Sequence, residues 1–366
     1  MISGSGENGG VAASAGARTL LRDCVHGHPG ERLLIVEEPD DAGYYDTAAA
    51  RMAAAEGRAL GFRVYETTAP SGLSDEHALS DFVSGLTGFD HVVFFARVGD
   101  QLRFSEIPGM PPATMCYTLD GGMLDSAFGT ACHPGMCEIK AAVDAAFAAA
   151  EHIRVTCPHG TDYAGRPVFQ TGGGSGEVTL KRFPMLVPRP VPAAGMAGRV
   201  ALSRFLVGTG SHFYEPYWVP LEEDVFAIVE GNRIVRFDGP GDMPARVSAH
   251  YEQVAGRFGI DPWYVHSWHP GIHPGCGFSG DAMKDMLRWS GSAFGNPRLL
   301  HFHTCGNYAP GEISWNLVDA TVVVDGVALW EAGRFYPERL PGSEALLARH
   351  PRLAALFEAP RRDIGL

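Results

Sequence analysis

The sequence predicts an α/β protein with two parts: an N-terminal Rossmann-like domain built on a parallel sheet, and a C-terminal α+β domain rich in antiparallel strands that carries the functional site. Apolar strand-like runs alternate with helical patterns over the first 150 residues. From Gly172 onward, short strand-like segments alternate with Pro and Gly turns. The length of 366 residues favours two domains. We therefore expect domains at 13–165 and 166–366, with residues 1–12 disordered.

The first half begins with a helix near 15–26 and continues into one βαβ unit over residues 31–68. An apolar run at 31–38, an alanine-rich helix at 45–60 and a second strand at 61–68 predict this unit and a parallel sheet. The turn after the first strand, Glu37 to Asp41, is acidic and would repel a phosphate. The Rossmann-like pattern therefore does not predict nucleotide binding.

The second half is predicted to contain two β-hairpins and a long helix. The hairpin at 225–237 has Gly231-Asn232 at its tip, and the hairpin at 320–330 has Asp325-Gly326. An amphipathic pattern over 243–258, followed by Gly259, predicts a helix. These elements indicate an antiparallel framework.

Charge and composition exclude several classes of function. The formal net charge is -13 and there is no basic run, which argues against a nucleic-acid surface. No apolar segment is long enough to predict a membrane span, and the first 17 residues lack the pattern of a signal peptide. We expect a cytoplasmic homo-oligomer that acts on a small molecule. Seven cysteines without a signal peptide predict free thiols.

Histidines gather in two short segments, 266–276 and 301–312. Five of the fifteen histidines lie there, and the stretch 278–300 between them has none. The segments are rich in Pro and Gly, and we expect them to be loops on the β-rich framework. The five histidines are His266, His269, His273, His301 and His303.

The chain resembles one family, the aminopeptidase T-type leucyl aminopeptidases together with their iron-dependent relatives, the 2,5-dihydroxypyridine dioxygenases. Several segments resemble the family and occur in the same order along the chain, over about residues 17 to 335. They are 17–36, 154–162, 229–239, the segment that begins at His266, and 324–334. In the peptidases an acidic residue opens the loop that corresponds to 266–274. This chain has His266 there, as the dioxygenases have an iron-binding histidine, and the resemblance therefore implies one metal ion. The family's closing His-x-Asp corresponds to Glu312-Ile-Ser314, where neither residue is kept.

Imidazoles and a carboxylate suit a mononuclear iron(II) site, which leaves positions open for dioxygen and substrate. Our hypothesis assigns His266, His301, His303 and Glu312 to the metal, since residues two apart on a strand share a face. His269 is the expected proton carrier. Fe(II) is the expected ion, with Zn, Mn or Co as alternatives. For His269 and His273 a structural role in the loop is the competing interpretation.

The function we expect first is that of a mononuclear iron(II) oxygenase acting on a small aromatic or amino-acid-derived substrate, and two other functions stay open. A metallohydrolase of the aminopeptidase kind would use a metal-activated water with Glu312 as its base. A binding protein without activity would explain why the closing His-x-Asp is missing. Cys276 and Cys305 lie near histidines, but no local signature supports a cysteine nucleophile.

Overall fold

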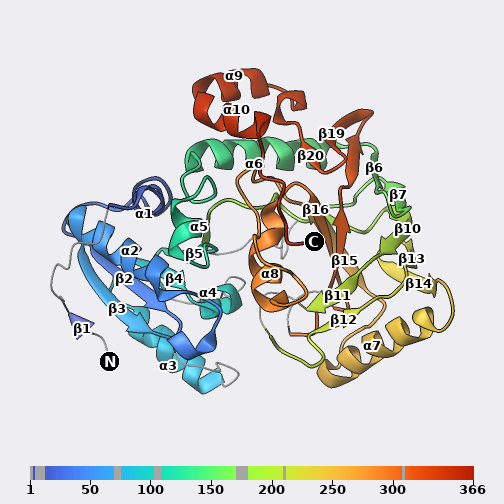
Figure 1. Ribbon diagram of the computed structural model, residues 1–366, viewed down its shortest axis with the longest axis horizontal. Coiled ribbons are helices and arrows are strands. Elements are labelled where there is room, and N and C mark those ends of the chain that lie inside the picture. Colours follow the sequence, from blue (N-terminus) through green and yellow to red (C-terminus); the bar gives the residue numbers. More distant parts are fainter. Residues whose placement is uncertain are drawn as a thin grey trace. The chain divides into compact units, whose positions relative to one another are not determined.

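The computed structural model describes residues 3–4, 13–69, 76–102, 109–169, 180–208, 212–306 and 310–366. The backbone forms two compact units (Figure 1). One comprises Met1–Cys137 and Glu177–Met185, and the other comprises Glu138–Gly176 and Leu186–Leu366. The boundary expected after residue 165 falls inside the second unit. The expected disorder of residues 1–12 concerns positions outside the described residues, except Ser3 and Gly4, which pair with a strand.

The first unit contains a mainly parallel sheet, sheet A, with the strand order β1-β3-β2-β4-β5-β8. Strand β2 pairs in parallel with β3 on one side and β4 on the other, which confirms the predicted βαβ unit and the α/β class. The strands are β1 (Ser3–Gly4), β2 (Arg32–Glu37), β3 (Arg63–Thr68), β4 (His91–Phe95), β5 (Ala113–Cys116) and β8 (Lys181–Phe183).

Helix α2 (Thr47–Ala59) makes the crossover between β2 and β3. The Asp46 carboxylate caps it by accepting a hydrogen bond from the Ala48 amide, and its buried alanines let it lie close to the sheet. The other helical segments of this unit are α1 (Ala15–Thr19), η1 (Leu20–Val25), η2 (Asp40–Ala42), α3 (Glu76–Leu86), α4 (Arg97–Leu102) and α5 (Gly121–Asp125). Helix α6 (His133–Ala149) begins in this unit and ends in the second.

Sheet B of the second unit is antiparallel and has the order β14-β13-β10-β7-β6-β18-β19-β20. It contains the two predicted hairpins. Glu230 pairs with Arg233 across Gly231-Asn232, and Val324 pairs with Val327 across Asp325-Gly326. The strands are β6 (Ile153–Thr156), β7 (Asp162–Gly165), β10 (Met196–Leu202), β13 (Val225–Glu230), β14 (Arg233–Asp238), β18 (Thr321–Val324), β19 (Val327–Glu331) and β20 (Arg334–Phe335).

Sheet C, in the same unit, has the order β12-β11-β17-β16-β15-β9. It corrects the expectation that the two histidine segments are loops, because β15 and β16 are adjacent antiparallel strands. Pro270 is the last residue of β15 and lies opposite Leu300 of β16. The strands are β9 (Val191–Pro192), β11 (Phe205–Gly208), β12 (Trp218–Pro220), β15 (Val265–Pro270), β16 (Leu299–Thr304) and β17 (Ile313–Val318).

One face of sheet C forms part of the core. Trp268, Phe302 and Trp315 lie opposite one another on β15, β16 and β17, and all three are fully buried. The ring of Phe302 meets that of Tyr163 on β7 edge to face at 5.4 Å, and Trp268 meets Phe147 of α6 at 5.7 Å. Because side chains alternate along a strand, the residues between these aromatics point to the other face.

The remaining helical segments of the second unit are α7 (Met243–Phe258), α8 (Met286–Ser292), η3 (Ala293–Gly295), η4 (Pro337–Arg339), α9 (Ser343–Arg349) and α10 (Pro351–Glu358). Helix α7 has the predicted bounds and ends at Gly259 with a positive φ of 66°. No helix within the described residues combines the length and the apolar character that crossing a bilayer requires. The seven cysteines are free thiols, as predicted.

Candidate metal centre

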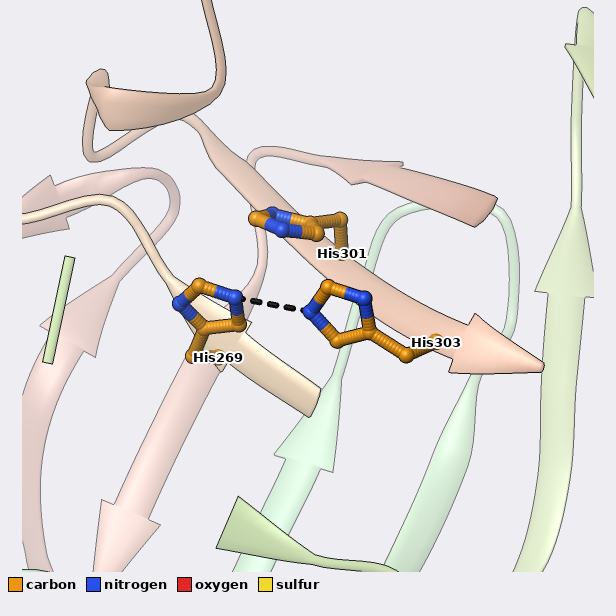
Figure 2. Close-up of side chains that lie close together, drawn as sticks. All are labelled: His269, His301 and His303. Atoms are coloured by element: carbon orange, nitrogen blue, oxygen red, sulfur yellow. Dashed lines mark hydrogen bonds between the residues drawn. The ribbon is translucent and has the colours of Figure 1, made fainter. Parts of the chain in front are cut away.

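Three histidines converge on the second face of sheet C. His301 and His303 lie two residues apart on β16, and His269 lies directly opposite His301 on β15. Figure 2 shows the three rings side by side, with His269 from one strand and the other two from its neighbour. Residues opposite each other in an antiparallel pair have side chains on the same face. The strand register therefore brings the three imidazoles together.

The three rings present a compact set of nitrogen atoms. Nε2 of His269 lies 2.9 Å from Nε2 of His303, and one nitrogen from each of the three rings lies within 4.8 Å of the others. The ring centroids of His269 and His301 are 4.1 Å apart, and those of His301 and His303 are 4.9 Å apart. Among the described residues, this is the one group of three or more His, Cys, Asp or Glu residues with such spacing.

Glu312 contacts the far side of the His303 ring. Its carboxylate is buried, with 3% of the side chain exposed, and it forms a short hydrogen bond with Nδ1 of His303. Because a carboxylate only accepts, Nδ1 carries the proton and donates it. In the neutral ring, Nε2 is then an acceptor, and it is hydrogen-bonded to Nε2 of His269. Glu312 thus sets the tautomer that a metal ion requires of His303.

His266 lies at an irregularity of β15 where the register shifts between Val265 and Ser267. Its Nδ1 lies 2.7 Å from Oγ of Ser267, and the ring is half-buried. Burial lowers the pKa of His266 to about 4; the nearby His303 lowers it as well, and the Glu312 carboxylate acts in the opposite direction. His266 is therefore neutral at pH 7. Neither His266 nor Glu312 belongs to the group of converging nitrogen atoms, and their predicted role as ligands stays a prediction.

Two polar residues of β17 share this face, and the sequence interpretation missed one of them. Ser314 lies opposite His303, and Asn316 lies opposite His301. The alternation of Ile313-Ser-Trp-Asn-Leu-Val318 already separates Ser314 and Asn316 from the apolar residues between them. That alternation is a signal for a shared face, but it does not reveal which strand lies alongside.

Apolar side chains lie at one end of the row of histidines. Leu299 and Val318 pair at the next position on the same face, and they belong to a buried cluster with Trp289 of α8. The ring of Phe294, in η3, meets His301 edge to face with the centroids 5.5 Å apart. The site is therefore polar at its base and apolar along one side.

Other residues considered from the sequence have structural roles. His273 is fully buried, and its Nδ1 accepts a hydrogen bond from the Gly275 amide at 3.1 Å. Burial raises the pKa of Cys276 and of Cys305 to about 12, so neither is a thiolate at neutral pH. Trp268 and Trp315 lie in the core on the opposite face.

The donor set fits a divalent transition metal. Two nitrogens that each bind one ion at about 2.1 Å, with angles near 90–110°, stand roughly 3.0–3.4 Å apart. The His269–His303 separation of 2.9 Å is close to that value. Imidazole suits iron, zinc and copper and is less suited to magnesium or calcium, which prefer oxygen ligands. The residues thus match a transition metal held by three neutral imidazoles.

A comparison with solved structures finds chains of similar fold, and one of them is a dioxygenase. The 2,5-dihydroxypyridine dioxygenase of Pseudomonas putida superimposes with a TM-score of 0.56 over 88% of this chain and 96% of that chain, at 13% sequence identity. An identity this low shows the shared fold alone. No protein-family model matches the chain, and no curated protein matches it.

Proposed function

We propose that this protein is a metal-dependent oxygenase that holds a single Fe(II) ion with His269, His301 and His303 and acts on a small organic substrate. The observation that carries the proposal is the convergence of three imidazole nitrogens within 4.8 Å on adjacent strands. His269, expected from the sequence to move protons, is here assigned to the metal. Glu312, expected to be a ligand, is assigned to the orientation of His303.

The chain's own residues prepare the site in two ways. The strands β15 and β16 hold the three rings on one sheet face, so little reorganisation accompanies binding. The buried Glu312 keeps the proton of His303 on Nδ1, away from the metal side. Iron(II), when bound, supplies the electron-transfer chemistry with dioxygen that amino-acid side chains lack.

Two observations favour an oxygenase over a two-metal peptidase. The converging group contains imidazoles only, whereas a pair of metal ions needs bridging carboxylates. The structural neighbour is a dioxygenase whose fold matches this chain over 96% of its own length, so the fold is compatible with the same class of chemistry here. The dihydroxypyridine of its name is the neighbour's substrate, and we propose only a small-molecule substrate for this chain.

A zinc-dependent hydrolase is the second candidate, because three histidines are also a known catalytic zinc set. The hypothesis of a binding protein without activity was based on the missing His-x-Asp. The three histidines offer another set of metal ligands, so the missing pair is a weaker argument for that hypothesis. The expected homo-oligomer remains a prediction, which light scattering on the purified protein would test.

Metal analysis and oxygen consumption test the proposal together. Protein purified without chelator, or reconstituted with Fe(II) under anaerobic conditions, is expected to hold about one equivalent of iron. The variant His301→Ala should hold little, and the control His152→Ala, at an exposed position of the same unit, should match the wild type. Wild-type protein that rebinds no Fe(II) would exclude the metal site. Two results together would favour the hydrolase. The iron-loaded protein would hydrolyse an amide or ester in the absence of oxygen, and it would consume no oxygen when given dihydroxylated aromatic compounds.

A further inference from the structure

We propose that Asn316 is a ligand-binding residue of this site, whose side-chain amide donates a hydrogen bond to an oxygen of a small anion bound beside the three histidines. This inference rests on the proposed metal centre. It identifies the charge and the hydrogen-bonding character of the ligand, which the metal set by itself does not determine.

The position of Asn316 follows from the strand register. It is the direct partner of His301 on β17, and His301 is the direct partner of His269 on β15. The three residues therefore form one row across three strands. Direct partners have Cβ atoms roughly 4.5–5.5 Å apart and point to the same face. Asn316 is thus adjacent to the metal ligands without being one of them.

The amide nitrogen of Asn316 is buried and has no hydrogen-bond partner among the described residues. A buried donor without a partner is costly, and most such groups in folded proteins are satisfied. A ligand bound beside the histidines would supply the acceptor for the Asn316 amide. The residue as a whole is half-buried.

Charge selects an anionic ligand. Three neutral imidazoles leave the two positive charges of a divalent ion uncompensated, and the Glu312 carboxylate lies behind His303. An oxygen anion complements this charge and also accepts from the Asn316 amide. The apolar side formed by Leu299, Val318 and Phe294 suits a ligand whose remaining part is apolar. The ligand class is therefore a small, partly apolar anion such as an aromatic carboxylate or phenolate.

With Co(II) in place of iron, metal binding and anion binding can both be measured without turnover. Benzoate is the anion used as the probe. Co(II) affinity and benzoate affinity are obtained from the visible absorption of the bound Co(II) in the wild type, in Asn316→Leu and in the control Thr321→Val. Leucine is close to asparagine in size and removes the donor. Thr321 is a half-buried residue of β18 in sheet B. We expect Asn316→Leu to weaken benzoate binding at least about tenfold while Co(II) affinity stays within about twofold.

These measurements distinguish a failure of the proposed metal centre from a failure of the proposed role of Asn316. Wild-type protein that binds no Co(II) would remove the proposed metal centre and this inference with it. Wild-type protein that binds Co(II) but not benzoate, or Asn316→Leu that binds benzoate as the wild type does, would overturn the role of Asn316 and leave the metal centre standing. Loss of Co(II) itself in Asn316→Leu would also overturn it, because Asn316 would then act on the metal.

Discussion

The carboxylate of Glu312 and the Nδ1 of His303 are hydrogen-bonded, so Glu312 lies on the opposite side of the ring from His269. The Tyr214 hydroxyl donates to the main-chain oxygen of Glu312 at 2.8 Å and helps to hold that residue in place. In this arrangement Glu312 would act on a bound metal ion through His303.

Replacing Glu312 by Gln should weaken metal binding by about 10- to 100-fold without abolishing it. The amide can still contact the ring but no longer stabilises the Nδ1–H tautomer by charge. Competition between the protein and a coloured chelator for Co(II) measures the effect. A complete loss of binding would show instead that Glu312 is a direct ligand, and unchanged affinity would show that the hydrogen bond has no influence.

The variants His269→Ala and His266→Ala distinguish the converging set from the set expected from sequence. Removing His269 should lower Co(II) affinity more than about 100-fold, since a direct ligand contributes more than an outer partner. Removing His266 should change it less than about tenfold, because its ring is directed to Ser267. The opposite ranking, measured by the same competition, would restore His266 as the ligand.

His250 should make stability depend on pH. It is 4% exposed on α7, its ring nitrogens have no hydrogen-bond partner among the described residues, and burial lowers its pKa from 6.5 to about 4. The unfolded chain binds the proton more tightly, so the stability contributed by the neutral ring is present above pH 6.5 and is lost as pH falls toward 4. The loss is about 3 kcal/mol for a shift of this size.

Urea unfolding at several pH values tests this contribution. His250→Phe should reduce the loss of unfolding free energy between pH 6.5 and 4 by about 3 kcal/mol, whereas His152→Gln, at an exposed position, should leave it as in the wild type. Equal slopes for His250→Phe and the wild type would show that another group causes the acid sensitivity.

Glu38 and Arg97 form a second testable pair, in the first unit. Glu38 follows β2, and Arg97 is the first residue of α4, after β4. Nε of Arg97 lies 2.8 Å from the buried Glu38 carboxylate. The main-chain amide of Arg97 also donates a hydrogen bond to this carboxylate. Arg97→Leu leaves the carboxylate buried without its cation and should cost about 3 kcal/mol in urea unfolding. The double variant Glu38→Gln/Arg97→Leu should recover part of that loss. Additive costs would mean that the two side chains do not interact.

Much of the fold follows from local patterns. The tips Gly231-Asn232 and Asp325-Gly326 allow the backbone conformations that tight hairpins need, and Gly259 ends α7 where the apolar spacing ends. The crossover between β2 and β3 follows from alternating strand and helix periods. Free cysteines follow from their number and from the sequence context.

The two-residue spacing of His301 and His303 by itself determined that they share a face wherever their segment is a strand, because side chains alternate along any strand. It did not determine what lies beside them. Only the tertiary structure placed His269 opposite His301, Glu312 against Nδ1 of His303 and Asn316 in the same row. The physical reason is that alternation specifies the face of a residue but not the neighbouring strand or its register. In sheet C, the buried row of Trp268, Phe302 and Trp315 on the opposite face accompanies that register, and a shift by one residue would expose these aromatics.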